Sequence, residues 1–161
     1  MDVCFELLRA GVKRREIKLN SKGDSMLPLV VGGRRLVVKP AKRLKLGDFI
    51  CFYQNDSLTA HRIVGFQEDM LLTKGDNCMR FDAPINRNQV IGKVENDSTE
   101  ILCRFLAAYS FLEGKIYSLT VGNSLFKILS GIKCRYITKK PVFIKFYRVL
   151  FKLPYTIVLK K

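Results

Sequence analysis

Two residues with complementary chemistry, Ser25 and His61, lie thirty-six positions apart in the sequence. Ser25 lies in the turn-prone run Gly23–Pro28 (GDSMLP), between a glycine and a proline. His61 is the single histidine of the chain, and its neighbours (AHRI) are typical of a β-strand. A serine hydroxyl becomes a good nucleophile when a positioned base takes its proton, and neutral imidazole suits that role. We therefore predict that Ser25 is a nucleophile and His61 its general base. The plain alternatives are a surface turn and a packed or solvated strand histidine.

A carboxylate that orients the imidazole would complete a triad of serine, histidine and acid. Two candidates follow His61: Asp76, in the run Lys74–Asn77 (KGDN), and Asp82. A Gly-Asp-Asn sequence is ordinarily explained by a tight turn in which the aspartate side chain bonds to nearby backbone. We therefore predict Asp82 as the orienting acid and Asp76 as a supporting or alternative acid. The alternative for Asp82 is a solvated loop carboxylate.

The elements that would position these groups are predominantly short strands. Runs rich in β-branched and aromatic residues, separated by turn residues, predict strands over 34–39, 49–53, 58–66, 70–74 and 89–94. Such closely spaced strands favour a small, mostly antiparallel coiled β-sheet or barrel. Helical periodicity precedes and follows it, in a short helix over 2–10 that ends at Gly11 and a longer one from 97 or 98 to 112 that ends at Gly114. A further helical stretch is predicted over 123–131.

Charge divides the chain into two regions. Residues 1–100 hold 17 basic and 13 acidic residues, whereas 101–161 hold 12 basic residues and one acid. We predict a mainly β domain over 1–100 and a basic, mainly helical extension over 101–161. Within the extension, residues 141–153 alternate cations with bulky apolar residues, as in a helix that lies on an anionic membrane. The alternative is a helix docked on the domain with its cations in water. Nucleic acid is disfavoured, because the extension is strongly apolar and carries no nucleic-acid motif.

The composition predicts neither a metal site nor a cofactor. Five scattered cysteines form no C-x-x-C pair, and there is one histidine. An odd number of cysteines favours a reducing compartment, and Met1–Arg15 lacks the apolar segment of a secretory signal. No run reaches the roughly 18 apolar residues of a membrane span. We therefore predict a cytoplasmic protein. If the helix over 141–153 lies on a membrane rather than docking on the domain, the protein is peripheral on its inner face. The sequence gives no indication of oligomeric state.

Taken together and in order, the motifs between Gly23 and Val94 resemble the signal-peptidase and LexA-type serine peptidase superfamily. They are GDSMLP (23–28), LGDFI (46–50), HRI (61–63), KGDN (74–77) and IGKV (91–94). The resemblance implies a LexA/signal-peptidase-like catalytic domain in which a serine attacks a peptide carbonyl. The histidine in an H-R-I context is similar to the endoplasmic-reticulum type, whose catalytic aspartate follows the K-G-D-N run at the position of Asp82. Met26 and Pro28, beside the nucleophile, are predicted to contact substrate.

The resemblance implies a serine endopeptidase that cuts an extended leader or signal-like segment of a partner protein. One departure bears on this: signal peptidases usually carry a serine two residues before the nucleophile, where its hydroxyl assists the oxyanion hole, and this chain has Gly23. Two alternatives follow. One is a non-catalytic module that holds an extended peptide on the same fold. The other is a basic membrane or nucleic-acid adaptor.

Overall fold

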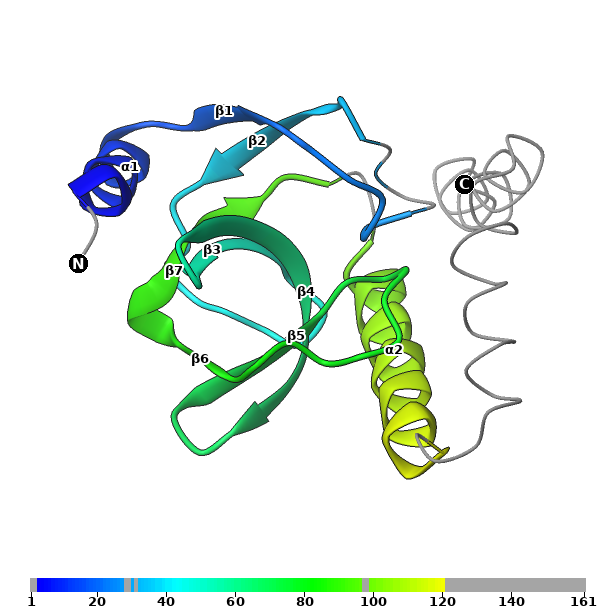
Figure 1. Cartoon of the computed structure of the whole chain (residues 1–161). Coiled ribbons are helices and arrows are strands. Elements are labelled where there is room, and N and C mark those ends of the chain that lie inside the picture. Colours follow the sequence, from blue (N-terminus) through cyan, green and yellow to red (C-terminus); the bar gives the residue numbers. More distant parts are fainter. Residues whose placement is uncertain (1–2, 28–29, 31, 97–98, 121–161) are drawn as a thin grey trace, which may run out of the picture.

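The fold is a strongly coiled, fully antiparallel sheet of seven strands with one helix at each end of the described chain (Figure 1). The computed structural model describes residues 3–27, 30, 32–96 and 99–120. The strand order in the sheet is β1-β2-β7-β3-β4-β5-β6. The elements are α1 (Val3–Arg14), β1 (Ile17–Asn20), β2 (Arg35–Lys39), β3 (Phe49–Gln54), β4 (Ser57–Gln67), β5 (Met70–Lys74), β6 (Ile85–Asn86), a 3₁₀ turn (Arg87–Gln89), β7 (Val90–Val94) and α2 (Glu100–Thr120).

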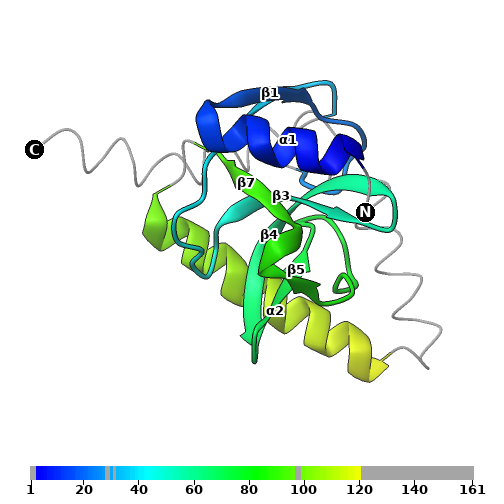
Figure 2. The same ribbon diagram turned by 90° about the vertical axis from the view of Figure 1, so that its left-hand side faces the viewer.

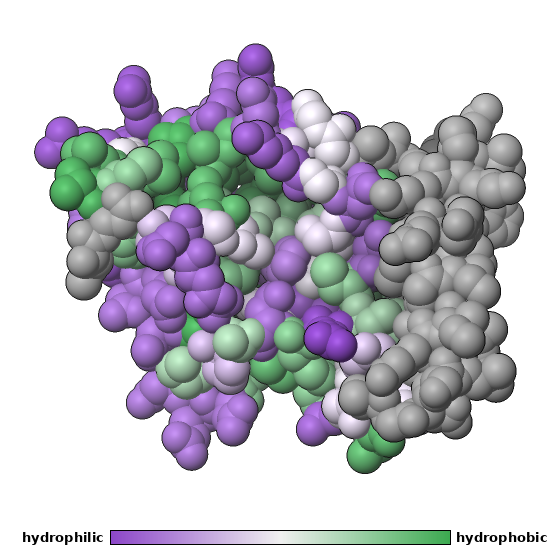
Figure 3. Space-filling model, in the orientation of Figure 1, coloured by the Kyte–Doolittle hydropathy of each residue, from purple (hydrophilic) through white to green (hydrophobic). Residues whose placement is uncertain are grey.

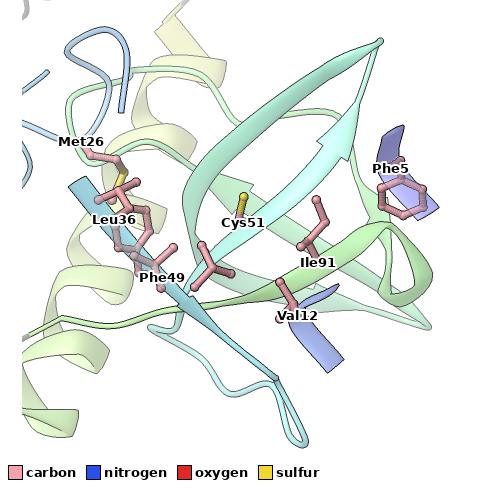
Figure 4. Packing of buried hydrophobic residues seen from close by; sticks show 9 residues of the cluster. Phe5, Val12, Met26, Leu36, Phe49, Cys51 and Ile91 are labelled. Carbon is pink, nitrogen blue, oxygen red and sulfur yellow. The ribbon is translucent and has the colours of Figure 1, made fainter. Parts of the chain in front are cut away.

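Two apolar clusters lie on opposite faces of the central strand β3, whose first four residues, Phe49–Phe52, are all buried. Such a continuous apolar run is expected for a strand covered on both faces. One cluster includes Phe49 and Cys51 together with Met26 and Leu36, and α1 contributes Phe5 and Val12 to it (Figure 4). The other is formed by Ile50, Phe52, Ile63, Leu71, Ile85 and Val90. Figure 2 shows α1 lying across the sheet beside β7.

α2 packs against β4 and the loop that follows β5, so the beginning of the basic region is part of the same folded unit. A Cβ atom at Gly114 would lie 2.4 Å from the Phe81 ring, and a Cβ atom at Gly47 would lie 2.5 Å from the Cys103 carbonyl oxygen. Both glycines therefore allow a close approach between the helix and the sheet. Gly47 also has a φ of +90°, which a residue with a side chain rarely adopts.

The mainly β prediction is confirmed, and each predicted strand matches an observed one to within a residue at either end. The predicted helix ends are wrong: α1 continues past Gly11 to Arg14, and α2 continues past Gly114 to Thr120. In both cases packing on the sheet outweighs the low helix propensity of glycine, because Val12 and Tyr117 are buried beyond these positions.

Two short edge elements, β1 and β6, escaped prediction. β1 has four residues with alternating polar positions, and β6 has two, so neither offers enough periodicity to read. The helices predicted over 123–131 and 141–153 lie outside the described residues. Among the helices described, neither has a stretch long and apolar enough to cross a membrane.

Candidate active site

His61 of β4 and Asp82, in the loop after β5, lie side by side. The His61 Nδ1 atom is 2.8 Å from the Asp82 Oδ2 atom. Thr73 of β5 donates its hydroxyl to the same carboxylate oxygen at 2.7 Å, and its carbonyl accepts the Asp82 backbone N–H at 3.0 Å. β5 pairs with β4, so the sheet register brings Thr73 and the Asp82 loop beside the histidine. Asp82 is thus held in place by one side-chain and one backbone hydrogen bond to Thr73, in addition to its contact with the imidazole.

The contact with Asp82 determines which nitrogen of the His61 ring can act as a base. An ionised carboxylate has only acceptor atoms, so Nδ1 must carry the proton that it donates to Asp82. The other nitrogen, Nε2, then holds a free lone pair in the neutral ring. This is the tautomer that a general base for a serine hydroxyl requires.

The turn that carries Ser25 is tied to the loop between β5 and Asp82. The Asn77 backbone N–H donates to the Ser25 carbonyl at 2.8 Å, and the Asn77 side-chain amide donates to the Asp24 carbonyl at 3.1 Å. A Cβ atom at Gly75 would lie 2.7 Å from the Ser25 carbonyl oxygen and 3.0 Å from His61 Nε2. The serine turn and the basic nitrogen therefore converge on the same glycine.

Ser25 and His61 are both lining residues of one groove, but their side chains make no hydrogen bond with each other in the part of the chain that is described. Such contacts are often long in unliganded enzymes and shorten when substrate binds. The Ser25 backbone N–H likewise donates to no described group.

The groove is lined largely by apolar residues. Its volume is about 630 Å³, and its walls come from β1 and the segment after it, from the Ser25 turn, and from residues 58–61 of β4. Met26, Val30, Leu36, Phe49 and Cys51 supply apolar lining. Figure 3 shows hydrophobic surface gathered in a hollow below β1 and β2. Within the described chain, residues 57–61 of β4 pair with β3 alone, because the pairing with β5 begins at Arg62.

Asp76 binds Arg62 rather than His61. Its two carboxylate oxygens accept from Arg62 Nε at 2.8 Å and Nη2 at 2.7 Å, and Arg62 Nη1 donates to the Gly47 carbonyl at 2.9 Å. Burial of the guanidinium opposes its charge, but the contact with Asp76 outweighs this and raises the pKa of Arg62 above its ordinary value. This bidentate pair braces β4 directly after His61.

Asp76→Asn is expected to destabilise the fold by about 3 kcal/mol or more, because it leaves the Arg62 charge buried without its partner. Arg62 is 1% exposed. The free energy of unfolding is measured by urea denaturation. The matched control is Glu100→Gln, which removes a carboxylate whose pairs with Lys45 and Arg104 are exposed, and it should change the midpoint little. Equal midpoints for the two variants would contradict the role assigned to Asp76.

Lys74 and Cys51 are two of the groups that could compete for the catalytic roles, and the surroundings of each disfavour it. Lys74 is fully buried, and its Nζ atom donates at 2.9 Å to both Ser110 and Glu113 of α2, away from the groove. Cys51 lines the groove, but burial raises the pKa of its thiol to about 12. A thiol of this kind stays protonated near neutral pH and is a weak nucleophile.

The remaining predicted site residues are placed as follows. Met26 is 5% exposed, belongs to the core and lines the groove, and its sulfur accepts the Asp76 backbone N–H at 3.5 Å. Pro28 lies outside the described residues. Sequence reasoning missed two residues of the site. Thr73 bonds the Asp82 carboxylate, and Asn77 links its own loop to the Ser25 turn. The sequence did predict a strand that contains Thr73 and ends at the KGDN run. A strand pattern does not show which distant side chain Thr73 contacts, so Asp82 could not be identified as its partner.

Comparison of the chain with models of known protein families finds no match, and comparison with curated proteins finds none either. The site therefore rests on its own geometry.

Proposed function

We propose that the protein is a serine endopeptidase of the signal-peptidase and LexA type, with Ser25 as nucleophile, His61 as general base and Asp82 as orienting acid. The observation that carries the proposal is the 2.8 Å contact between His61 Nδ1 and Asp82, with His61 Nε2 facing the Ser25 turn across Gly75. The coiled antiparallel sheet and the five motifs between residues 23 and 94 support the same class.

In the proposed reaction, the Ser25 hydroxyl oxygen attacks a peptide carbonyl while His61 Nε2 takes its proton. The Asp82 carboxylate then stabilises the imidazolium. The Ser25 backbone N–H, which has no described acceptor, donates to the oxyanion. Collapse of this intermediate breaks the C–N bond, and His61 returns its proton to the leaving amine. Water, activated by the same nitrogen, hydrolyses the acyl-serine ester and restores the enzyme.

The groove favours an extended, apolar peptide segment as substrate. The outer edge of β1 and residues 57–61 of β4 both present backbone groups that an added strand could bond. The floor between them is apolar, and Met26 lies next to the nucleophile. We therefore propose that the substrate is a leader or signal-like segment of a partner protein, presented in β conformation.

The direct test is cleavage of a library of unstructured peptides that vary in apolar residues, with the products identified by mass spectrometry. The wild-type chain should cut a subset at defined bonds, and the Ser25→Ala protein should cut none of them. Circular dichroism must show both proteins folded. Identical products from the Ser25→Ala protein would remove the enzyme proposal.

A second candidate is a peptide-binding module on the same fold. It is favoured by Gly23, which offers no side-chain donor to an oxyanion, and by the absence of a described bond between the Ser25 hydroxyl and His61. This candidate expects library peptides to bind in the groove with no product formed. Peptide recovered intact with the folded wild-type protein after long incubation would favour it over the peptidase.

A further inference from the structure

α2 has two apolar faces along its length, one buried and one exposed. One face packs on the sheet through Cys103, Leu106, Ala107, Gly114 and Tyr117. The other carries large apolar side chains at helical spacing, which we call the α2 stripe. Its members and their exposed fractions are Ile101 82%, Phe105 60%, Tyr109 49%, Leu112 59%, Ile116 41% and Leu119 84%. A surface helix normally turns such residues toward a core, so the α2 stripe needs another explanation.

The α2 stripe is continuous and far larger than the scattered apolar residues of an ordinary surface. From Ile101 to Leu119 it extends about 27 Å at 1.5 Å per residue. No polar side chain of α2 falls within this arc, and exposed Ala108 lies at its edge. Contiguous apolar surface of this kind marks an interaction site.

The charges around the α2 stripe favour an anionic partner. Two cations, Arg104 and Lys115, border the same side of the arc. The acids of α2 are both engaged with cations: Glu100 contacts Lys45 and Arg104, and Glu113 turns to buried Lys74. The helix therefore carries no acid directed at a partner on the stripe side.

The chain that continues from the end of α2 strengthens this charge. Residues 121–161 contain ten Lys and Arg residues and no Asp or Glu, and they are rich in large apolar residues. A second copy of this chain would bring the same positive charge to the stripe and would be repelled by it. The chain's own basic segment would likewise be repelled by the two cations that border the stripe. An anionic lipid surface meets both the apolar arc and the cations.

We propose that the α2 stripe is a membrane-binding surface that inserts its apolar side chains into the interface of an anionic bilayer. Each large side chain moved from water into the acyl boundary contributes through burial of apolar area, and the basic residues contribute through attraction to the lipid headgroups. α2 packs on β4 through the face opposite the α2 stripe, so the stripe can insert without disturbing that contact. The proposal concerns binding and does not depend on peptidase activity.

The test is cosedimentation of the full chain with vesicles of phosphatidylcholine and phosphatidylglycerol at 7:3, and with phosphatidylcholine alone. The wild-type protein should bind the anionic vesicles more tightly, and the double variant Phe105→Ser/Leu112→Ser should weaken that binding by about tenfold or more. The matched control is Val3→Ser/Leu7→Ser, which removes two apolar residues of α1 that are somewhat more exposed, at 73% and 68%, and should leave binding unchanged.

Unchanged vesicle binding in the Phe105→Ser/Leu112→Ser protein would overturn the proposal, and two further measurements would then identify what covers the stripe. A wild-type dimer, measured by light scattering, that this variant converts to a monomer would make the stripe an interface between copies. A large fall in the melting temperature of this variant alone would mean that the chain's own C-terminal segment covers the stripe.

Discussion

Replacement of His61 by alanine is expected to lower the rate of peptide-bond cleavage by about five to six orders of magnitude. Loss of the general base leaves the Ser25 hydroxyl protonated and weakly nucleophilic, and removal of one member of such a unit costs nearly as much as removal of all of them. His61 is the single histidine of the chain, so no other imidazole can replace it. The measurement is the turnover of the best-cut library peptide.

Two controls make the His61→Ala result specific. Added imidazole should restore part of the rate, because the cavity left beside Ser25 and Asp82 can hold a free ring. Cys78 supplies the second control, since its sulfur lies 2.8 Å from where a Cβ at Gly75 would be, close to His61 Nε2. Cys78→Ala should keep the wild-type rate if Ser25 is the nucleophile. A His61→Ala protein with near-normal turnover, or a Cys78→Ala protein that has lost it, would contradict the assigned roles.

Asp82→Asn is expected to lower turnover by about four orders of magnitude while the fold is retained. An asparagine amide facing Nδ1 can donate to it, which favours the ring tautomer with the proton on Nε2. That proton blocks the lone pair that must accept the Ser25 hydrogen. The Thr73 hydroxyl, which donates to this carboxylate oxygen in the wild-type protein, can accept from an amide NH2 at the same position, and the Thr73 carbonyl still holds the backbone N–H of residue 82, so the loss is one of chemistry more than of position.

The tautomer itself can be observed, because one histidine gives one pair of imidazole ¹⁵N signals. The wild-type protein should show a protonated Nδ1 and an unprotonated Nε2 in the neutral ring, and Asp82→Asn should reverse the two. The matched control is Asp69→Asn in the exposed turn after β4, which should change neither the spectrum nor the rate. Wild-type turnover in the Asp82→Asn protein would show that the carboxylate does not orient the base.

The sequence by itself determined the central strands and the residue types of the candidate site. Strands such as Phe49–Gln54 and Met70–Lys74 could be predicted because their composition and flanking turns are local signals, set by neighbouring residues. The pairing of Ser25 with His61 was a chemical inference from a serine in an unusual turn and the single histidine. It needed no knowledge of contacts.

The tertiary structure decided which partner each acid contacts. The G-D-N turn and the family resemblance favoured Asp82 over Asp76 as the acid beside His61, but they did not identify Arg62 as the partner of Asp76; the sheet register turns Asp76 to Arg62 and Asp82 to His61. Gly114 continues a helix because Phe81 packs against it, and Lys74 is buried because α2 supplies Glu113 thirty-nine positions later. Contacts between residues far apart in the chain depend on how the elements pack, and periodicity along the sequence carries no record of that packing.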